Sequence, residues 1–302
     1  MSANDSTVLS AAEFMLRQAL LGATPLVLAG YGELVAQRAG VINVGIEGLM
    51  LMGCIAAYAG AVATQSAAMG VAAAIAVGVL FALLFAIVTI WCRADQIVTG
   101  TAINLLALGA STTAWGVLRN SSNNTPPPLF EPIVFGQYWL FFFTLALGVA
   151  IWVWLRFTRA GLIVQALGDA PDAANAAGVR VRLWRTLIVL GAGACAGLAG
   201  SYLSTMRGHS FQINMTAGAG FLVLALVIFG RWTLPGLVLA TLLFGALEGL
   251  QAYLSALPNA TAHVPHQLFE MLPYAATLIA LAALTRSRSG PIYLGRSWPE
   301  ER

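Results

Sequence analysis

Apolar runs long enough to cross the hydrocarbon core of a bilayer recur along this sequence, and no other feature restricts its fold as strongly. A spanning helix needs about 20 predominantly apolar residues. Hydrophobic residues make up 59% of the 302-residue chain and charged residues only 9%, whereas soluble domains carry about 25% charged residues. We therefore expect an all-α polytopic membrane protein folded as a single transmembrane domain over residues 1–302. The nine predicted spans, with eight to ten as the range, cover roughly residues 14–36, 44–65, 70–91, 97–118, 138–155, 187–206, 217–230, 235–254 and 269–285.

The basic residues predict how these spans are oriented. All 15 of them are arginine, and the cytoplasmic loops of membrane proteins carry an excess of arginine and lysine. If nine spans are threaded with the C-terminus in the cytoplasm, only Arg17, Arg119 and Arg207 fall on the outside. The distribution therefore predicts an external N-terminus and a cytoplasmic C-terminus.

The same composition argues against catalysis in this chain. The absence of lysine excludes a Walker A lysine, a Schiff-base lysine and a Ser-Lys pair. Three cysteines without paired spacing indicate neither a disulfide framework nor a thiolate metal site. His263 and His266 are separated by Pro265, so we interpret them as part of a solvated loop and expect no metal site. No nucleophile or acid–base constellation is present, and we expect a protein that is not an enzyme.

The most informative local stretch is residues 38–50, with the sequence RAGVINVGIEGLM. Its glycines weaken or bend a helix, while Asn43 and Glu47 place an amide and a carboxylate between two apolar runs. Ionisable residues inside a membrane are costly and indicate a functional site by default. We interpret the stretch as an interrupted helix that lines a transport path. For Glu47 the alternative, that it caps or hydrogen-bonds a neighbouring helix, is equally open.

A weak internal repeat suggests a counterpart to this stretch. Asn43 and Gln96 are separated by 53 positions, as are Asn214 and Gln267. In the predicted topology, units of about 14–118 and 187–285 have opposite orientations, and such inverted repeats build their paths from interrupted helices at corresponding positions. The residues around 214–220 are therefore predicted to be the partner of 38–50. The glycines expected to interrupt the two helices are Gly40, Gly45, Gly48, Gly218 and Gly220.

Other polar residues within or just before the predicted spans are further candidates for the path or its gate. Asn104 and Glu248 each interrupt an apolar run, Glu33 does so with a weaker context, and Asn214 lies beside the glycine-rich entry to the span 217–230. The alternative is that such side chains only join helices, at about 1 kcal/mol or less each. The complete set of predicted path or gate residues is Asn43, Glu47, Asn104, Asn214 and Glu248.

The longest stretch between spans that is neither apolar nor proline-rich is residues 156–186. Pro171 fits the first turn of a helix and Gly178 fits its end, so a short alanine-rich cytoplasmic helix is predicted. It is suited to docking into a groove of a partner, although an interfacial connector is an equally open interpretation. The docking residues would be Gly168, Asp169, Pro171, Asp172, Ala173, Ala174, Asn175 and Gly178.

Several stretches, in the order 38–50, 95–104, 166–179, 218–221 and 229–232, resemble the permease subunits of ABC importers for nucleosides and related simple sugars. The resemblance covers residues 20–284. The first stretch is its most specific part and is similar to the nucleoside branch, in particular to the shorter of the two permeases that this branch pairs.

The resemblance implies a multi-pass subunit of a bacterial inner membrane that forms a path with a second, different permease. It implies two further partners: a cytoplasmic ATPase that binds ATP and Mg²⁺, and an extracytoplasmic solute-binding lipoprotein. This chain would hold no cofactor, and Gly168 to Gly178 would dock into the ATPase. The expected solute is a nucleoside or a similar small polar ring compound. The alternatives are a simple sugar or riboflavin-like solute, and a stand-alone transporter that couples to protons through Glu47 or Glu33.

Overall fold

A computed structural model describes residues 3–121, 128, 130–256, 271, 275 and 290–298. In this part of the chain the regular elements are α-helices and two short π-helical turns, η1 and η2, which continue α3 and α8. Their bounds are α1 (Ala3–Arg38), α2 (Ile46–Thr64), α3 (Ala67–Ala86), η1 (Ile87–Trp91), α4 (Gln96–Ser121), α5 (Trp139–Phe157), α6 (Arg159–Asp169), α7 (Pro171–Ala176), α8 (Val181–Ser201), η2 (Tyr202–Arg207), α9 (Ala219–Phe229) and α10 (Leu234–Ala256).

The structure confirms an all-α protein with several membrane-spanning helices. Within the described residues, seven helices are long and apolar enough to cross a bilayer. They correspond to seven of the predicted spans, and the short run at 217–230 corresponds to the 11-residue helix α9. The run at 269–285 and the loop with His263 and His266 lie outside the described residues, so the count of nine spans stays a prediction.

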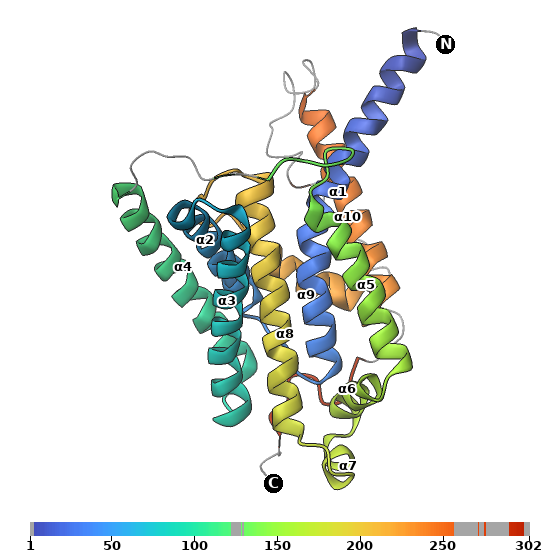
Figure 1. Ribbon diagram of the computed structural model, residues 1–302. Helices are drawn as coiled ribbons and strands as arrows, with labels where there is room; N and C mark the ends of the chain where they lie inside the picture. The colour runs from blue at the N-terminus through green and yellow to red at the C-terminus, as the bar shows by residue number, and fades with distance from the viewer. Residues whose placement is uncertain are drawn as a thin grey trace.

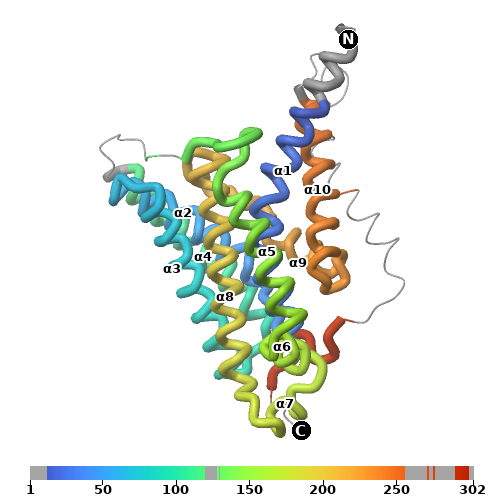
Figure 2. Tube along the Cα trace, turned by 45° about the vertical axis from the view of Figure 1, so that its right-hand side comes forward, coloured from blue at the N-terminus to red at the C-terminus, as the bar shows by residue number. Residues whose placement is uncertain are grey.

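The helices form an elongated bundle with α1 near its centre (Figure 1). Helix α1 packs against α8, α10 and α9, and α2 and α3 pack against each other and against α8. Helix α4 contacts mainly α2 and lies at the periphery. The N-terminus lies at one end of the bundle, and α6, α7 and the C-terminal residues lie at the other (Figures 1 and 2).

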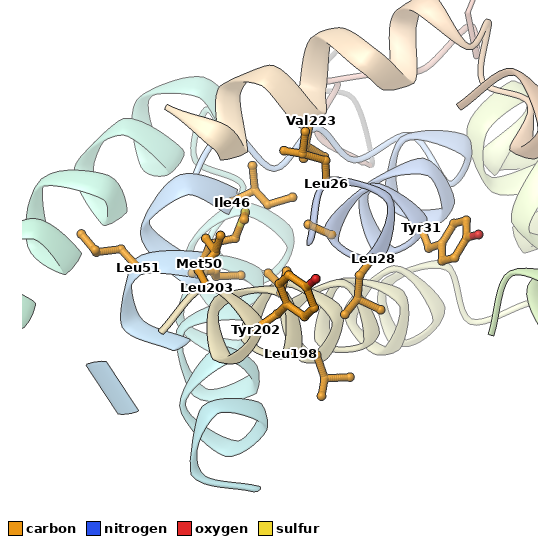
Figure 3. Packing of buried hydrophobic residues seen from close by; sticks show 14 of the residues in the cluster. Leu26, Leu28, Tyr31, Ile46, Met50, Leu51, Leu198, Tyr202, Leu203 and Val223 are labelled. Carbon is orange, nitrogen blue, oxygen red and sulfur yellow. The ribbon is translucent and has the colours of Figure 1, made fainter. Parts of the chain in front are cut away.

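Apolar side chains from four elements meet where these helices cross. Leu26 of α1, Met50 of α2, Tyr202 and Leu203 of η2 and Val223 of α9 belong to one buried cluster (Figure 3). Lipid is as apolar as these side chains, so close packing rather than loss of water drives such contacts in a membrane. The cluster therefore depends on helices that fit closely together.

Small residues allow that close fit between α2, α3 and α8. A Cβ added at Gly53 would lie 2.7 Å from the carbonyl oxygen of Gly197. A Cβ added at Gly193 would overlap Ala82 and lie 2.6 Å from the carbonyl oxygen of Gly78. Gly191, two positions earlier on α8, has no atom within 4 Å of an added Cβ. The small residues of α8 therefore differ in role according to the face on which they lie.

This difference gives a matched pair of variants. Gly193→Ala is expected to lower the free energy of unfolding in detergent by about 1–3 kcal/mol, because it overpacks the contact with α3. Gly191→Ala is expected to leave stability unchanged or raise it by up to about 1 kcal/mol, because alanine favours the helix over glycine. Thermal unfolding of the two purified variants measures the difference, and equal melting temperatures would contradict this packing.

Candidate translocation site

Within the stretch 38–50, residues 39–45 are not helical and separate α1 from α2, so the interruption predicted from the glycines is present. The chain leaves α1 after Arg38 and turns at Gly40, whose φ of +85° favours glycine. It then returns along α1, so that the Asn43 N–H donates to Glu33 Oε1 at 3.2 Å. Helix α2 starts at Ile46, beside the interior of the bundle. We call residues 38–50 the first interrupted segment.

Glu47 lies in the first turn of α2, and its carboxylate caps another helix. Oε1 accepts hydrogen bonds from the Thr216 hydroxyl at 2.5 Å and the Gly218 N–H at 2.9 Å. Oε2 accepts from the Gly220 N–H at 2.6 Å. Helix α9 starts at Ala219, so these amides belong to its otherwise unpaired N-terminus. A carboxylate is favoured there by both hydrogen bonding and the helix dipole.

The two glycines at this junction explain why the segments come so close. Gly218 has a φ of +86°, a conformation that other residues rarely adopt. A Cβ added at Gly220 would lie 2.5 Å from the Cα and the N of Glu47. Residues 214–220, which we call the second interrupted segment, therefore contact the first one directly through Glu47. Of the two interpretations of Glu47 that the sequence left open, the geometry matches the cap on a neighbouring helix.

Helix α4 satisfies the backbone of the first interrupted segment. The Asn104 side chain accepts from the Gly48 N–H at 2.8 Å and donates to the Val44 carbonyl at 3.0 Å. The Gln96 side chain accepts from the Ile42 N–H at 2.8 Å. Both polar ends of the Asn104 amide are thus used within the protein. Asn104 therefore holds the first interrupted segment in place through its amide.

A buried polar chain runs along the other side of the segment. Glu33 is fully buried, and its Oε1 also accepts from the Gln37 amide at 2.9 Å. Gln37 in turn accepts from the Trp232 indole N–H at 2.8 Å. Glu33 Oε2 and Asn43 Oδ1 have no hydrogen-bond partner among the described residues. The sequence analysis missed Gln37 and Trp232, although the i, i+4 spacing of Glu33 and Gln37 was the signal that could have found the first.

A polar cavity of about 530 Å³ lies beside the second interrupted segment. It lies between α1, η2, α9 and α10, and its size falls within the range of small-molecule sites. Its polar lining consists of Arg207, Ser210, Gln212, Asn214, Thr216 and Glu248.

Two predicted path residues, Asn214 and Glu248, are brought together in this cavity although 34 positions separate them. Glu248 Oε2 is buried and has no hydrogen-bond partner among the residues that the structure describes, and the absence of a side chain at Gly22 of α1 makes room for it. Thr216 lines the cavity and also binds Glu47, so the wall of the cavity adjoins the cap. Asn43 and Asn104 are not part of the lining.

The short helix predicted after Pro171 is present as α7, with Gly178 just beyond its end at a φ of +87°. Pro171 and Ala174 are buried, whereas Asp172, Ala173 and Asn175 are exposed. The preceding helix α6, over Arg159–Asp169, was not predicted from the sequence. It is capped by Thr158, which accepts from the Gly161 N–H at 3.3 Å. Together α6 and α7 form a helical projection at the end of the bundle opposite the N-terminus (Figure 1).

Comparison with known proteins gives a family match over most of the chain. The family model described as "Branched-chain amino acid transport system / permease component" matches residues 15–281. The nucleoside ABC transporter permease protein NupC of Lactococcus lactis is 31% identical, over 91% of this chain and 93% of that protein. The guanosine ABC transporter permease protein NupQ of Bacillus subtilis is 30% identical, over 90% of this chain and 92% of that protein. The putative glucose ABC transporter permease protein TsgC13 of Haloferax volcanii is 32% identical, over 93% of this chain and 94% of that protein.

The cap on α9 can be tested without a transport assay. Glu47→Ala removes the acceptor for three donors, and each hydrogen bond to a charged group is worth about 1.5–3 kcal/mol. The variant is expected to lower the free energy of unfolding by at least about 3 kcal/mol. Glu47→Gln retains one side-chain oxygen and should lose less. Thermal unfolding of the purified protein measures both.

The control for these variants is Glu13→Ala, which removes an exposed carboxylate near the other end of α1. Its melting temperature is expected to equal that of the wild type. If Glu47→Ala also had the melting temperature of the wild type, the carboxylate would not stabilise the start of α9.

Proposed function

This chain belongs to the family of permease components of branched-chain amino acid transport systems, and within that family we propose that it imports nucleosides or related small polar ring compounds. It is a multi-pass membrane subunit of the ABC permease class. Relatives named as nucleoside and guanosine permeases, about 30% identical over some 90% of the chain, support this choice of solute.

The observation that carries the proposal is the polar cavity beside the two interrupted segments. This space of about 530 Å³ combines amides, hydroxyls, a carboxylate and a guanidinium with apolar side chains such as Leu222 and Phe244. A nucleoside carries N–H and O–H donors together with ring and hydroxyl acceptors, and it has no net charge. Such a solute can exchange its hydrogen bonds with water for bonds to Asn214, Gln212 and Glu248.

A simple sugar is the second candidate solute, because the relative from Haloferax is named as a putative glucose permease. A sugar offers hydroxyl groups but no flat ring edge with N–H donors. Direct competition between a nucleoside and glucose for uptake separates the two. A stand-alone proton-coupled transporter is less well supported, because the relatives are named as ABC permeases and the Glu47 carboxylate is engaged by three donors.

We further propose the arrangement of this subunit and its partners. Arg38, Arg156, Arg159, Arg180 and Arg182 lie at or next to the helix ends from which α6 and α7 project. By the positive-inside rule that end faces the cytoplasm, and the N-terminus faces outward. A cytoplasmic ATPase, which binds ATP and Mg²⁺, would receive α7. A solute-binding protein would deliver the solute at the other end, and a second, different permease would complete the path.

In this proposal the cavity receives the solute, and the Glu47 cap controls the passage beyond it. Glu47 binds the start of α9, and this contact fixes helix α2 to helix α9 at the inner wall of the cavity. Moving the two interrupted segments apart would open the path toward α7. Asn104 and Gln96 keep the first interrupted segment attached to α4 during this movement.

The cavity predicts a transport defect in one charge-neutral variant. Glu248→Gln keeps the shape of the side chain but removes the charged acceptor, so it is expected to lower kcat/KM for nucleoside uptake by about tenfold, equivalent to 1.4 kcal/mol. The control is Gln251→Ala, because Gln251 lies about one turn further along α10 and does not line the cavity. Uptake of a labelled nucleoside into proteoliposomes that contain the assembled complex measures both. Equal losses in the two variants would show that the solute does not meet Glu248.

The exposed surface of α7 predicts a separate defect in coupling. Ala173→Trp adds bulk to the exposed side of α7 without touching the buried Pro171 or Ala174. Solute-stimulated ATP hydrolysis is expected to fall about tenfold, because a docking helix must fit its groove closely and a tenfold loss corresponds to only about 1.4 kcal/mol. Ala68→Trp, at an exposed position near the opposite end of the bundle, is the control. Normal stimulated hydrolysis in Ala173→Trp would refute docking through α7.

A further inference from the structure

The C-terminal segment, residues 290–298, crosses the end of the bundle that bears α6 and α7 (Figure 2). Its backbone is joined to two other elements. The Tyr293 N–H donates to the Gly168 carbonyl at the end of α6 at 2.8 Å. The Gly295 N–H donates to the Gly40 carbonyl in the first interrupted segment at 3.1 Å. The segment therefore bridges the helical projection and the first interruption.

Arg185 of α8 joins the same elements from the inside. The residue is only 2% exposed, and its side chain donates three hydrogen bonds to backbone carbonyls of described residues. Nε donates to Ala39 at 3.0 Å, Nη2 to Leu167 at 3.0 Å and Nη1 to Arg296 at 3.3 Å. One guanidinium thus holds the end of α1, the end of α6 and the C-terminal segment together.

This use of arginine is costly if stability is its only purpose. Burying a cation requires hydrogen bonds to offset the loss of water, and a well-packed apolar side chain is often at least as stabilising as a buried charged group. A guanidinium offers five donors in a fixed planar arrangement, which no other side chain provides. The geometry at Arg185 therefore suits a joint that must keep three chain segments in register.

The C-terminal segment also contacts α7 itself. The Trp298 indole N–H donates to Asp172 Oδ1 at 2.8 Å. At the other end of the segment, Gly290 packs so closely on the Trp232 ring that an added Cβ would lie 2.7 Å from it. Trp232 accepts from Arg38 Nε through its carbonyl at 2.6 Å. The segment thus runs from α7 past Gly40 to the turn between α9 and α10.

We propose that the C-terminal segment and Arg185 transmit movement of α7 to the first interrupted segment, and that Arg185 and Trp298 are positioning residues for transport. A displacement of α7 would move Trp298, then the backbone at Gly295, and then Gly40 in the first interrupted segment, which also contains Glu47. This proposal rests on the ATP-driven function proposed above. The proposal adds a second connection between the ATPase contact on α7 and the Glu47 cap, which runs through the C-terminal segment in addition to the covalent link through α6.

Uptake per ATP hydrolysed is the first test. Trp298→Phe keeps an aromatic ring but removes the N–H that binds Asp172, and Arg185→Lys keeps the charge but not the planar arrangement of donors. In the assembled complex in proteoliposomes, each is expected to retain at least half of the ATP hydrolysis while uptake per ATP falls about fivefold, or roughly 1 kcal/mol. Arg180→Gln, at an exposed position just before α8, is the control and should keep the wild-type ratio. A wild-type ratio in both variants would overturn the proposal.

Hydrogen exchange of the permease provides a readout that does not depend on the solute or the energy source. Amides of residues 39–46 are expected to exchange at least fivefold faster in Arg185→Lys and in Trp298→Phe than in the wild type. Their exchange rates are expected to be unchanged in Arg180→Gln. Unchanged exchange in both variants would overturn the linkage even if the complex transports nucleosides. Faster exchange in the two variants, together with a wild-type complex that shows no nucleoside uptake, would instead support the linkage and contradict the proposed function.

Discussion

The hydrogen bonds of the Glu47 carboxylate to the start of α9 are the interaction on which the rest of this structure depends. A carboxylate in an apolar bundle is tolerated only where donors replace its water. Two backbone N–H groups and one hydroxyl do so here, at 2.9, 2.6 and 2.5 Å. The N-terminus of α9 needs an acceptor for the same reason. The carboxylate therefore supplies the acceptor that the start of α9 needs, and α9 supplies the donors that the carboxylate needs. This exchange joins the two interrupted segments at one junction.

Two features extend from this junction in opposite directions. Toward the N-terminal end lies the polar cavity, which shares Thr216 with the cap. Toward the other end, the first interrupted segment is joined to α6 and the C-terminal segment through Gly40 and Arg185. The proposed solute site and the proposed ATPase-contacting surface are thus connected through a short stretch of hydrogen-bonded backbone.

The sequence predicted the seven long spans that the structure describes, and the two interruptions, because apolar length and glycine content act locally. It also singled out Glu248, which lines the cavity, since an acidic residue in the middle of a span stands out from its neighbours. It left the role of Glu47 open, because a cap depends on which helix end lies opposite, and that is a property of the packing. Asn104 was placed with the path residues because its sequence context does not show that both ends of its amide bind backbone. Arg185 remained unnoticed, since a single arginine in a basic segment also fits the positive-inside rule.

A double-mutant cycle between Glu47 and Thr216 tests the central claim most directly, because the two residues belong to different interrupted segments and meet only through the cap. The free energies of unfolding in mixed micelles are measured for the wild type, Glu47→Ala, Thr216→Val and the double variant. Residues in contact typically show coupling energies of about 0.5–3 kcal/mol, and a charged acceptor places the expected value at or above roughly 1.5 kcal/mol. A coupling energy within about 0.3 kcal/mol of zero, as for independent sites, would contradict the junction and with it the proposed gate.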